Sequence, residues 1–184
     1  MALLNSNLQA LPIGSTAPVF SLKGTDGKRH SLKDIASGKA NLILFMCNHC
    51  PYVKAVRERI NALRAAFPKQ DLVIIGINSN DAEEYPDDSF EQMQEFHKLF
   101  PVDYYLIDET QSVAKAYGAV CTPDPYLFDS SLKLVYHGRI DDGYLDPVKV
   151  TVQDLKHAIG ATILGKPISE KPHPSMGCSI KWKQ

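Results

Sequence analysis

The sequence predicts an α/β fold in which helices flank a central, mixed β-sheet. Two continuous apolar runs, at residues 42–46 and 72–77, indicate buried strands. Between them, from residue 53 to residue 67, apolar side chains recur at helical spacing and charged ones occupy the opposite face. A strand, a helix and a second strand in this order form a parallel unit with a right-handed crossover. An antiparallel hairpin at residues 126–137 makes the predicted sheet mixed.

The N-terminal third predicts a small β extension to this sheet. Residues 13–22 indicate a loop that leads into a short strand. Residues 25–28 have the sequence Thr-Asp-Gly-Lys, which is typical of a turn, and residues 30–32 begin a second extended piece. We therefore expect a short hairpin here, followed by one helical turn that starts near Ser31.

The remaining elements follow in chain order. We expect an acidic loop, a helix, a third strand, a short helix, the hairpin and a closing helix, at residues 78–88, 90–99, 104–107, 112–117, 126–137 and 152–164. From Gly165 the chain is rich in proline, which indicates extended backbone rather than a second domain. The predicted organisation is a single domain over residues 1–166 and an extended C-terminal tail over residues 167–184.

Composition and charge narrow the functional classes. Of the 184 residues, 44% are hydrophobic, which is enough for a core without disulfide cross-links. The 20 Lys and Arg residues balance 21 Asp and Glu residues, so no basic patch predicts nucleic-acid binding. The apolar runs are too short to cross a bilayer, and residues 1–22 lack the basic start of a secretory signal. We therefore expect a cytoplasmic protein whose partners are neither nucleic acids nor membranes.

The most informative feature is the motif Cys47-Asn48-His49-Cys50. The two cysteines follow a predicted strand and precede a predicted helix, whose first N–H groups favour a negatively charged sulfur. The thiolate is the form of cysteine that attacks disulfides, peroxides and metals. In a cytoplasmic chain such a pair is more often catalytic or metal-binding than structural. We expect Cys47 to ionise easily and attack a disulfide, and Cys50 to resolve the mixed disulfide that results.

Several short motifs accompany the cysteine pair, namely Ala17-Pro18, Ser31-Leu32, Ile75-Gly76-Ile77, Tyr117-Gly118 and Thr122-Pro123. With these motifs, residues 12–164 resemble the thioredoxin-like superfamily and, within it, the redoxin branch of AhpC/TSA proteins. A peroxiredoxin-like group with a Cys-x-x-Cys motif is the most similar part of that branch. The resemblance implies a thioredoxin fold, an exposed Cys47, and electron transfer through the cysteines without an organic cofactor.

The resemblance also implies a substrate-binding loop at Thr122-Pro123. In this fold a cis-proline lies beside the cysteine pair, and Thr122 would pair its N–H and C=O with an extended substrate. We place Asn48 in the same substrate-binding region. His49 directly precedes Cys50, where a cation or an N–H donor stabilises the thiolate and makes the couple more oxidising. The alternative is an exposed histidine with a minor effect.

Three further residues have two interpretations each. Cys121 is either a buried small hydrophobic residue or a third redox partner. By resemblance to peroxiredoxins, Arg139 would stabilise the thiolate and polarise peroxide; the alternative is a surface ion pair with Asp141 or Asp142. Cys178, in the tail, either reaches back to another cysteine or stays alone. Because Cys121 and Cys178 do not form a second closely spaced pair, we expect no metal site.

The sequence departs from two known members of this superfamily. Peroxiredoxins have a threonine three residues before the attacking cysteine, where this chain has Leu44. Thioredoxin has a buried aspartate six residues before its first cysteine, where this chain has Asn41. The first departure weakens the case for a peroxidase. The second means that another group or a water carries the proton of Cys50.

The sequence therefore predicts a thiol-disulfide oxidoreductase. Its partners would be protein or small-molecule disulfides and thiols, with a cellular thiol as reductant and no cofactor. One alternative is a thiol peroxidase that reduces hydrogen or alkyl peroxides. A second alternative is a non-catalytic module that binds a metal or a partner protein. We expect a monomer or a weak homodimer.

Overall fold

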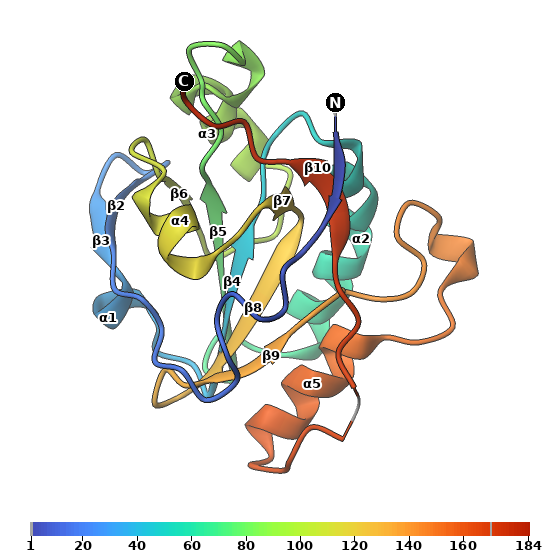
Figure 1. Ribbon diagram of the computed structural model, residues 1–184. Coiled ribbons are helices and arrows are strands. Elements are labelled where there is room, and N and C mark those ends of the chain that lie inside the picture. Colours follow the sequence, from blue (N-terminus) through green and yellow to red (C-terminus); the bar gives the residue numbers. More distant parts are fainter. Residues whose placement is uncertain (1, 170) are drawn as a thin grey trace.

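The computed structural model describes residues 2–169 and 171–184 of the chain. Its main layer is a mixed sheet (Figure 1) made of β2 Ser21–Gly24, β3 Arg29–Ser31, β4 Ala40–Phe45, β5 Leu72–Asn78, β6 Tyr104–Ile107, β8 Asp124–Asp129 and β9 Leu134–His137. Their spatial order is β3-β2-β6-β5-β4-β8-β9. Strands β4 and β6 run parallel to β5, whereas β8 runs antiparallel to β4. This arrangement confirms the predicted fold class.

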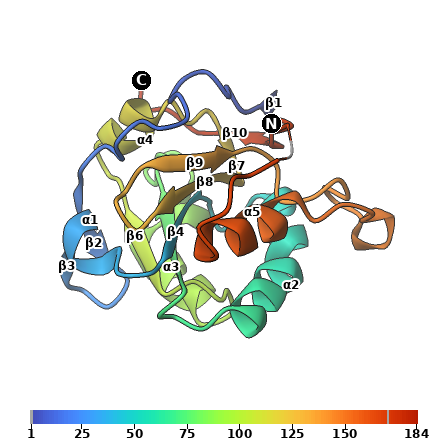
Figure 2. The same cartoon turned by 90° about the horizontal axis from the view of Figure 1, so that it is seen from below.

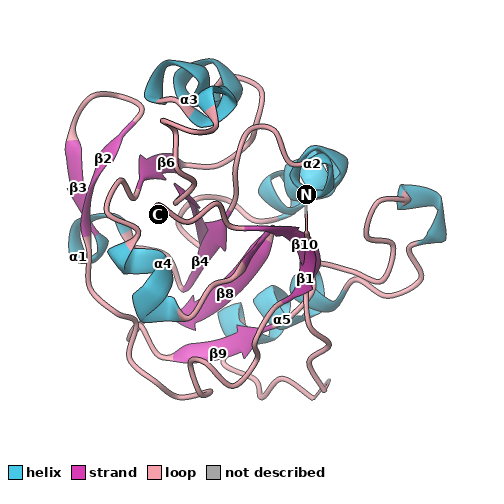
Figure 3. Cartoon of the chain, turned by 45° about the horizontal axis from the view of Figure 1, so that its top comes forward, coloured by secondary structure: helices cyan, strands magenta, loops and turns pink. Residues whose placement is uncertain are grey.

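Helices cover both faces of the sheet, with bounds α1 Leu32–Ile35, α2 Pro51–Ala66, α3 Phe90–His97, α4 Ser112–Tyr117 and α5 Asp154–Ile163. Apolar residues of α2, α3 and α5 pack with Leu42 and Leu44, whereas those of α1 and α4 pack with Ile43 and Phe45. Because successive side chains of a strand point to opposite faces, β4 contributes to both cores. Figure 3 shows β4 and β8 between α4 on one side and α2 on the other.

Helix α2 begins directly after the cysteine motif. Cys50 is the N-cap residue with extended backbone, and Pro51 occupies the first helical position, where a missing N–H group costs nothing. The residues that α2 buries have the predicted helical spacing, namely Val53, Val56, Ile60 and Leu63. Their packing on the sheet holds both cysteines at the carboxyl end of β4.

A second, small sheet joins the two ends of the chain. It contains β1 Leu3–Asn5, β10 Met176–Ser179 and β7 Cys121–Thr122, in the antiparallel order β1-β10-β7. The predicted tail is thus extended, but it packs against the domain instead of forming a flexible end. A Cβ atom added to Gly177 would lie 1.9 Å from the carbonyl oxygen of Thr122, so glycine permits the close approach of β10.

Two short 3-10 helices lie in the connections, η1 at Pro86–Asp88 and η2 at Pro147–Lys149. The segment between β9 and α5, which contains η2, projects from the body of the molecule (Figure 1, Figure 2). Across the described residues, no helix has the length and apolar character needed to cross a bilayer.

Candidate active site

Cys47 and Cys50 lie in the turn between β4 and α2, and both are buried, with 1% and 0% of their surface exposed. No disulfide links any of the four cysteines. The exposure that the resemblance implied for Cys47 is wrong in this structure, because both sulfurs pack in the core cluster that contains Tyr105 and Cys178. A protein substrate therefore reaches Cys47 only if a covering segment moves.

Thr122 contacts both sulfurs. Its hydroxyl Oγ1 lies 3.3 Å from Cys47 Sγ, and its carbonyl oxygen lies 3.3 Å from Cys50 Sγ, from which it accepts a hydrogen bond when Cys50 is protonated. The Thr122-Pro123 peptide bond is cis, as the resemblance implied. The backbone of Thr122 is not open to a substrate here, since β10 occupies that place and Cys178 is the register partner of Thr122.

His49 forms a pair with Asp88, which is 1% exposed at the end of η1. His49 Nδ1 lies 2.6 Å from Asp88 Oδ2. The carboxylate also accepts hydrogen bonds from the backbone N–H of Asn48 and the side-chain N–H of Asn80, both at 2.7 Å. The His49 ring stacks on Tyr85. The alternative of a solvent-exposed histidine is therefore wrong. Asp88 belongs to the predicted acidic loop but is buried, with three nitrogen atoms within hydrogen-bond distance of its carboxylate.

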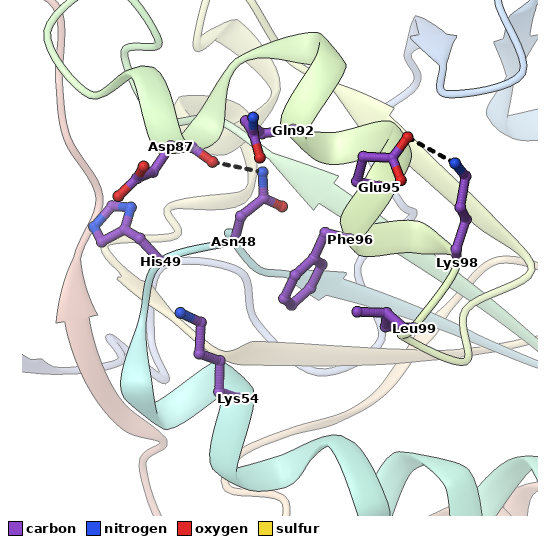
Figure 4. Close-up of a pocket in the computed structure, with 9 residues that line it drawn as sticks. All are labelled: Asn48, His49, Lys54, Asp87, Gln92, Glu95, Phe96, Lys98 and Leu99. Carbon is purple, nitrogen blue, oxygen red and sulfur yellow. Dashed lines mark hydrogen bonds and ion pairs between the residues drawn. The ribbon is translucent and has the colours of Figure 1, made fainter.

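Asn48 lines an open cavity of about 410 Å³ beside the motif (Figure 4). Lys54 from α2 and Phe96 and Leu99 from the α3 region form other parts of its wall. The Asn48 side chain is held by the protein itself, since its Nδ2 donates to the Asp87 carbonyl at 2.9 Å and its Oδ1 accepts from the Tyr105 hydroxyl at 2.8 Å. A ligand in this cavity would meet the edge of the motif, not the sulfurs directly.

The two thiols of the motif have opposite pKa shifts. The hydrogen bond from Cys47 lowers the pKa of Cys50 to about 5 against the effect of burial, with support from Cys178 and the backbone N–H of Val53. The same hydrogen bond, burial and the charge of Asp88 raise the pKa of Cys47 well above its ordinary value. At neutral pH the pair thus holds one proton on Cys47 and the negative charge on Cys50. This order of ionisation differs from the expectation that Cys47 ionises first.

The other two cysteines have different surroundings. Cys178 Sγ lies 3.0 Å from Cys50 Sγ, so the tail cysteine reaches back to the motif, which was one of its two predicted interpretations. Cys121 is fully buried on β7, and burial raises the pKa of its thiol far above the ordinary value. A fully buried, protonated thiol fits the interpretation of Cys121 as a small hydrophobic residue.

The cysteine pair lies at the start of a helix and beside a cis-proline. A comparison with known protein families agrees with this geometry. A model of the AhpC/TSA family matches residues 13–137. The chain belongs to this family. The match covers the main sheet and the motif, and it confirms the resemblance predicted from the sequence.

Relatives of this AhpC/TSA protein include some named as thiol-disulfide oxidoreductases and some named as peroxiredoxins. The chain is 30% identical to the thiol-disulfide oxidoreductase ResA of Geobacillus thermodenitrificans, over 68% of each chain. It is also 30% identical, over 61% of this chain and 69% of the relative, to a Helicobacter pylori protein whose name assigns it to the peroxiredoxins. These relatives and the fold confirm a thioredoxin-like oxidoreductase.

Two solved structures match nearly the whole chain. An uncharacterized conserved protein of Geobacillus kaustophilus is 45% identical with a TM-score of 0.92, covering 100% of this chain and 97% of the other. A hypothetical protein of Sinorhizobium meliloti 1021 is 37% identical with a TM-score of 0.89, covering 97% and 98%. Both likenesses include the C-terminal segment that the family model leaves out.

Arg139 of this AhpC/TSA protein is anchored to α5. Its Nε donates to Asp154 Oδ2 at 3.0 Å, and both side chains are largely buried. The expected surface pair with Asp141 or Asp142 is therefore wrong, because Asp141 instead pairs with Arg59 and Asp142 accepts hydrogen bonds from the segment before α5. This hydrogen bond links Arg139, which follows β9, to the first residue of α5 and so gives Arg139 a structural role.

For the metal-binding alternative, the described residues offer one possible donor set, formed by Cys47, His49 and Asp88. One donor atom from each residue lies within 4.8 Å of the others. The oxygens of Asp88 already accept hydrogen bonds from three nitrogen atoms. These hydrogen bonds hold the Asp88 carboxylate and the His49 ring in place.

Sequence reasoning missed Asp88 and Tyr105, and it left open whether Cys178 reaches another cysteine. Asp88 lies among several acidic residues of one polar loop, and nothing local separates the buried carboxylate from its exposed neighbours. The glycine before Cys178 was a usable signal, since glycine within an extended segment often marks a close backbone approach.

Proposed function

We propose that this protein catalyses thiol-disulfide exchange through Cys47 and Cys50. The observation that carries the proposal is the position of Cys47 and Cys50 at the start of α2, where both sulfurs contact Thr122 beside the cis Thr122-Pro123 bond. A stabilised thiolate in the reduced protein is the property that lets a cysteine pair exchange disulfides at neutral pH.

Cys47 is the attacking sulfur in this proposal, because Cys50 Sγ contacts both the Thr122 carbonyl oxygen and Cys178 Sγ, which leave less room for a substrate sulfur. Cys47 loses its proton as its sulfur bonds to one sulfur of a substrate disulfide, and the other substrate sulfur leaves as a thiolate. Cys50 then attacks Cys47 Sγ, which forms the Cys47–Cys50 disulfide and releases the second substrate thiol. Two electrons pass from the protein to the substrate.

The His49–Asp88 pair carries the proton of Cys47. A histidine held by a carboxylate beside a thiol is an arrangement that activates cysteine nucleophiles. The ring accepts the proton of Cys47, Asp88 stabilises the charged ring, and the proton then passes to the leaving thiolate.

Insulin reduction with dithiothreitol as electron donor tests the proposal. We expect Cys47→Ser and Cys50→Ser each to abolish the catalysed rate, whereas Cys121→Ser retains it because Cys121 forms no hydrogen bond with either motif cysteine. Wild-type and Cys47→Ser protein with equal rates would overturn the proposal.

A thiol peroxidase is the second candidate, and the peroxiredoxin name of one relative favours it. The hydroxyl of Thr122, at 3.3 Å from Cys47 Sγ, is a donor that could bind a peroxide oxygen there. Consumption of hydrogen peroxide that depends on Cys47 and exceeds the rate of insulin reduction would favour this candidate.

We further propose that the protein works in the cytoplasm as a monomer or weak homodimer, on protein or small-molecule disulfides, with a cellular thiol as reductant. The name of the ResA relative supports the substrate class. Cell fractionation and sedimentation of the purified protein check the location and the oligomeric state.

A further inference from the structure

We infer that Cys178 is a third redox cysteine, which forms a disulfide with Cys50 in place of the Cys47–Cys50 disulfide. The inference deepens the proposed function and rests on it. It assigns β10 a chemical part in the exchange reaction, beyond covering the site.

The sulfur of Cys178 lies in direct contact with the sulfur of Cys50. The two sulfurs are 3.0 Å apart, closer than either motif sulfur is to Thr122. Both cysteines are buried, with 4% of Cys178 and 0% of Cys50 exposed, so the contact lies in the core. The contact needs no rearrangement of the chain before the two sulfurs meet.

Backbone pairing holds Cys178 in this position. Strand β10 lies between β1 and β7, and Cys178 is in register with Leu3 on one side and Thr122 on the other. Gly177 brings β10 against the Thr122 carbonyl, where any larger residue would collide. The position of Cys178 is thus set by two strands and a required glycine, unlike that of a cysteine in a flexible tail.

The reaction begins from the Cys47–Cys50 disulfide that substrate reduction leaves. The sulfur of Cys178 loses its proton and attacks Cys50 Sγ. The Cys178–Cys50 bond forms as the Cys50–Cys47 bond breaks, and its electron pair leaves on Cys47 Sγ, which takes up one proton. No net oxidation occurs, so no further oxidant or reductant is required.

Two groups favour this exchange, the Thr122 hydroxyl at the leaving sulfur and Lys181 near the attacking sulfur. The Thr122 hydroxyl, 3.3 Å from Cys47 Sγ, can donate to the sulfur that leaves. Burial and the neighbouring Cys50 raise the pKa of Cys178 to about 12, whereas Lys181 lowers it. The contribution from Cys50 disappears once Cys50 is part of a disulfide, because a disulfide sulfur carries no charge. The new bond ties β10 to the start of α2 and returns Cys47 as a thiol.

Cys121 is the matched control within the same chain. It neighbours Thr122 on β7, and successive side chains of a strand point to opposite faces. The Thr122 hydroxyl contacts Cys47, and the alternation places the Cys121 side chain on the other side of β7, where no hydrogen bond joins it to Cys47 or Cys50. A general tendency of buried cysteines to cross-link would involve Cys121 as much as Cys178.

The test uses full-length Cys47→Ser protein treated with oxidised glutathione, followed by alkylation and peptide mapping by mass spectrometry. Cys50 first forms a mixed disulfide with one glutathione, and Cys178 then displaces that glutathione. We expect the Cys50–Cys178 disulfide within the monomer as the product. The link should be lost in Cys47→Ser/Cys178→Ser and retained in Cys47→Ser/Cys121→Ser. Persistent glutathione on Cys50, or unreacted Cys50, together with an alkylated Cys178, would overturn the inference.

Wild-type protein provides a second measurement if Cys47→Ser fails to fold. Partly oxidised wild-type protein should contain molecules with alkylated Cys47 and linked Cys50–Cys178, and Cys178→Ser should lack them. Their absence from wild-type protein that does form the Cys47–Cys50 disulfide would overturn the inference and leave the proposed function intact. Failure of the proposed function would instead appear as the absence of insulin reduction by wild-type protein.

Discussion

Asp88 decides what His49 can do in this site. A lone histidine beside a thiol only adds a nearby N–H group, but a histidine held by a buried carboxylate can accept a proton and keep its ring fixed. The 2.6 Å contact of His49 Nδ1 with Asp88 therefore changes the predicted tuning residue into a proposed proton carrier. Three nitrogen atoms lie within hydrogen-bond distance of the buried Asp88 carboxyl group and hold it in place.

Replacing His49 by alanine is expected to slow insulin reduction by about 100-fold, the lower range for loss of general acid–base catalysis. Steady-state rates at saturating dithiothreitol measure this effect. His30→Ala is the matched control, because His30 Nε2 contacts Asp26 at 3.0 Å far from the cysteines. Similar rates for the two variants would show that His49 carries no proton.

The motif residues could be found from the sequence, whereas their partners could not. The Cys-x-x-Cys spacing and the helix that follows identify Cys47 and Cys50 from local pattern alone. Asp88 meets His49 across 39 residues of sequence, and Cys178 meets Cys50 across 128. Contacts at such separations depend on how the strands are ordered in space, which spacing along the chain does not reveal.

Strand β10 lies on the cis-proline loop as a bound peptide strand would. It pairs antiparallel with β7, and its Cys178 stands opposite Thr122 with its sulfur against Cys50. The chain thus covers its own cysteine pair with a strand that carries a cysteine. The larger elements, β4, α2 and β5, were predictable from apolar periodicity. Strands β1 and β10 were not, because three or four residues are too few to establish a pattern.

Gly177→Ala is expected to push β10 away from the cysteine pair. The added methyl group would lie 1.9 Å from the Thr122 carbonyl oxygen, and such overpacking costs about 1–3 kcal/mol of stability. Alkylation of Cys50 in the reduced protein should become faster, which timed iodoacetamide labelling measures.

Gly160→Ala is the control for this substitution. Nothing lies within 4 Å of a Cβ atom at Gly160 in α5, and alanine in a helix adds roughly 0.5–1 kcal/mol of stability. Cys50 labelling should not change in this variant. Unchanged Cys50 labelling in Gly177→Ala would contradict the covering role of β10.

The stability of the whole molecule is coupled to the charge of the cysteine pair. The pKa of Cys50 is about 5 in the folded protein, against an ordinary value of 9.0. Between these two values the unfolded chain keeps a proton that the folded chain has lost. The free energy of unfolding of the reduced protein therefore rises with pH across this window, and the gain is lost as the pH falls through 5.

Urea denaturation of the reduced protein between pH 5 and 9 measures this dependence. One proton contributes at most about 1.4 kcal/mol per pH unit. The rise should be smaller in Cys50→Ser, whereas Cys121→Ser should keep it because its buried thiol stays protonated throughout. If the free energy of unfolding depended on pH equally in wild-type and Cys50→Ser protein, the thiolate would not be on Cys50.

The reduction potential of the cysteine pair tests the central claim most directly. Wild-type protein would be equilibrated in glutathione buffers of known potential, with Cys47→Ser as the control. Because the reduced form is stabilised by the Cys50 thiolate, we expect a two-electron transition above the ~−270 mV of thioredoxin, toward the ~−120 mV of DsbA. A potential at or below that of thioredoxin would contradict the stabilised thiolate, and no exchange at all would contradict the assignment of a redox pair.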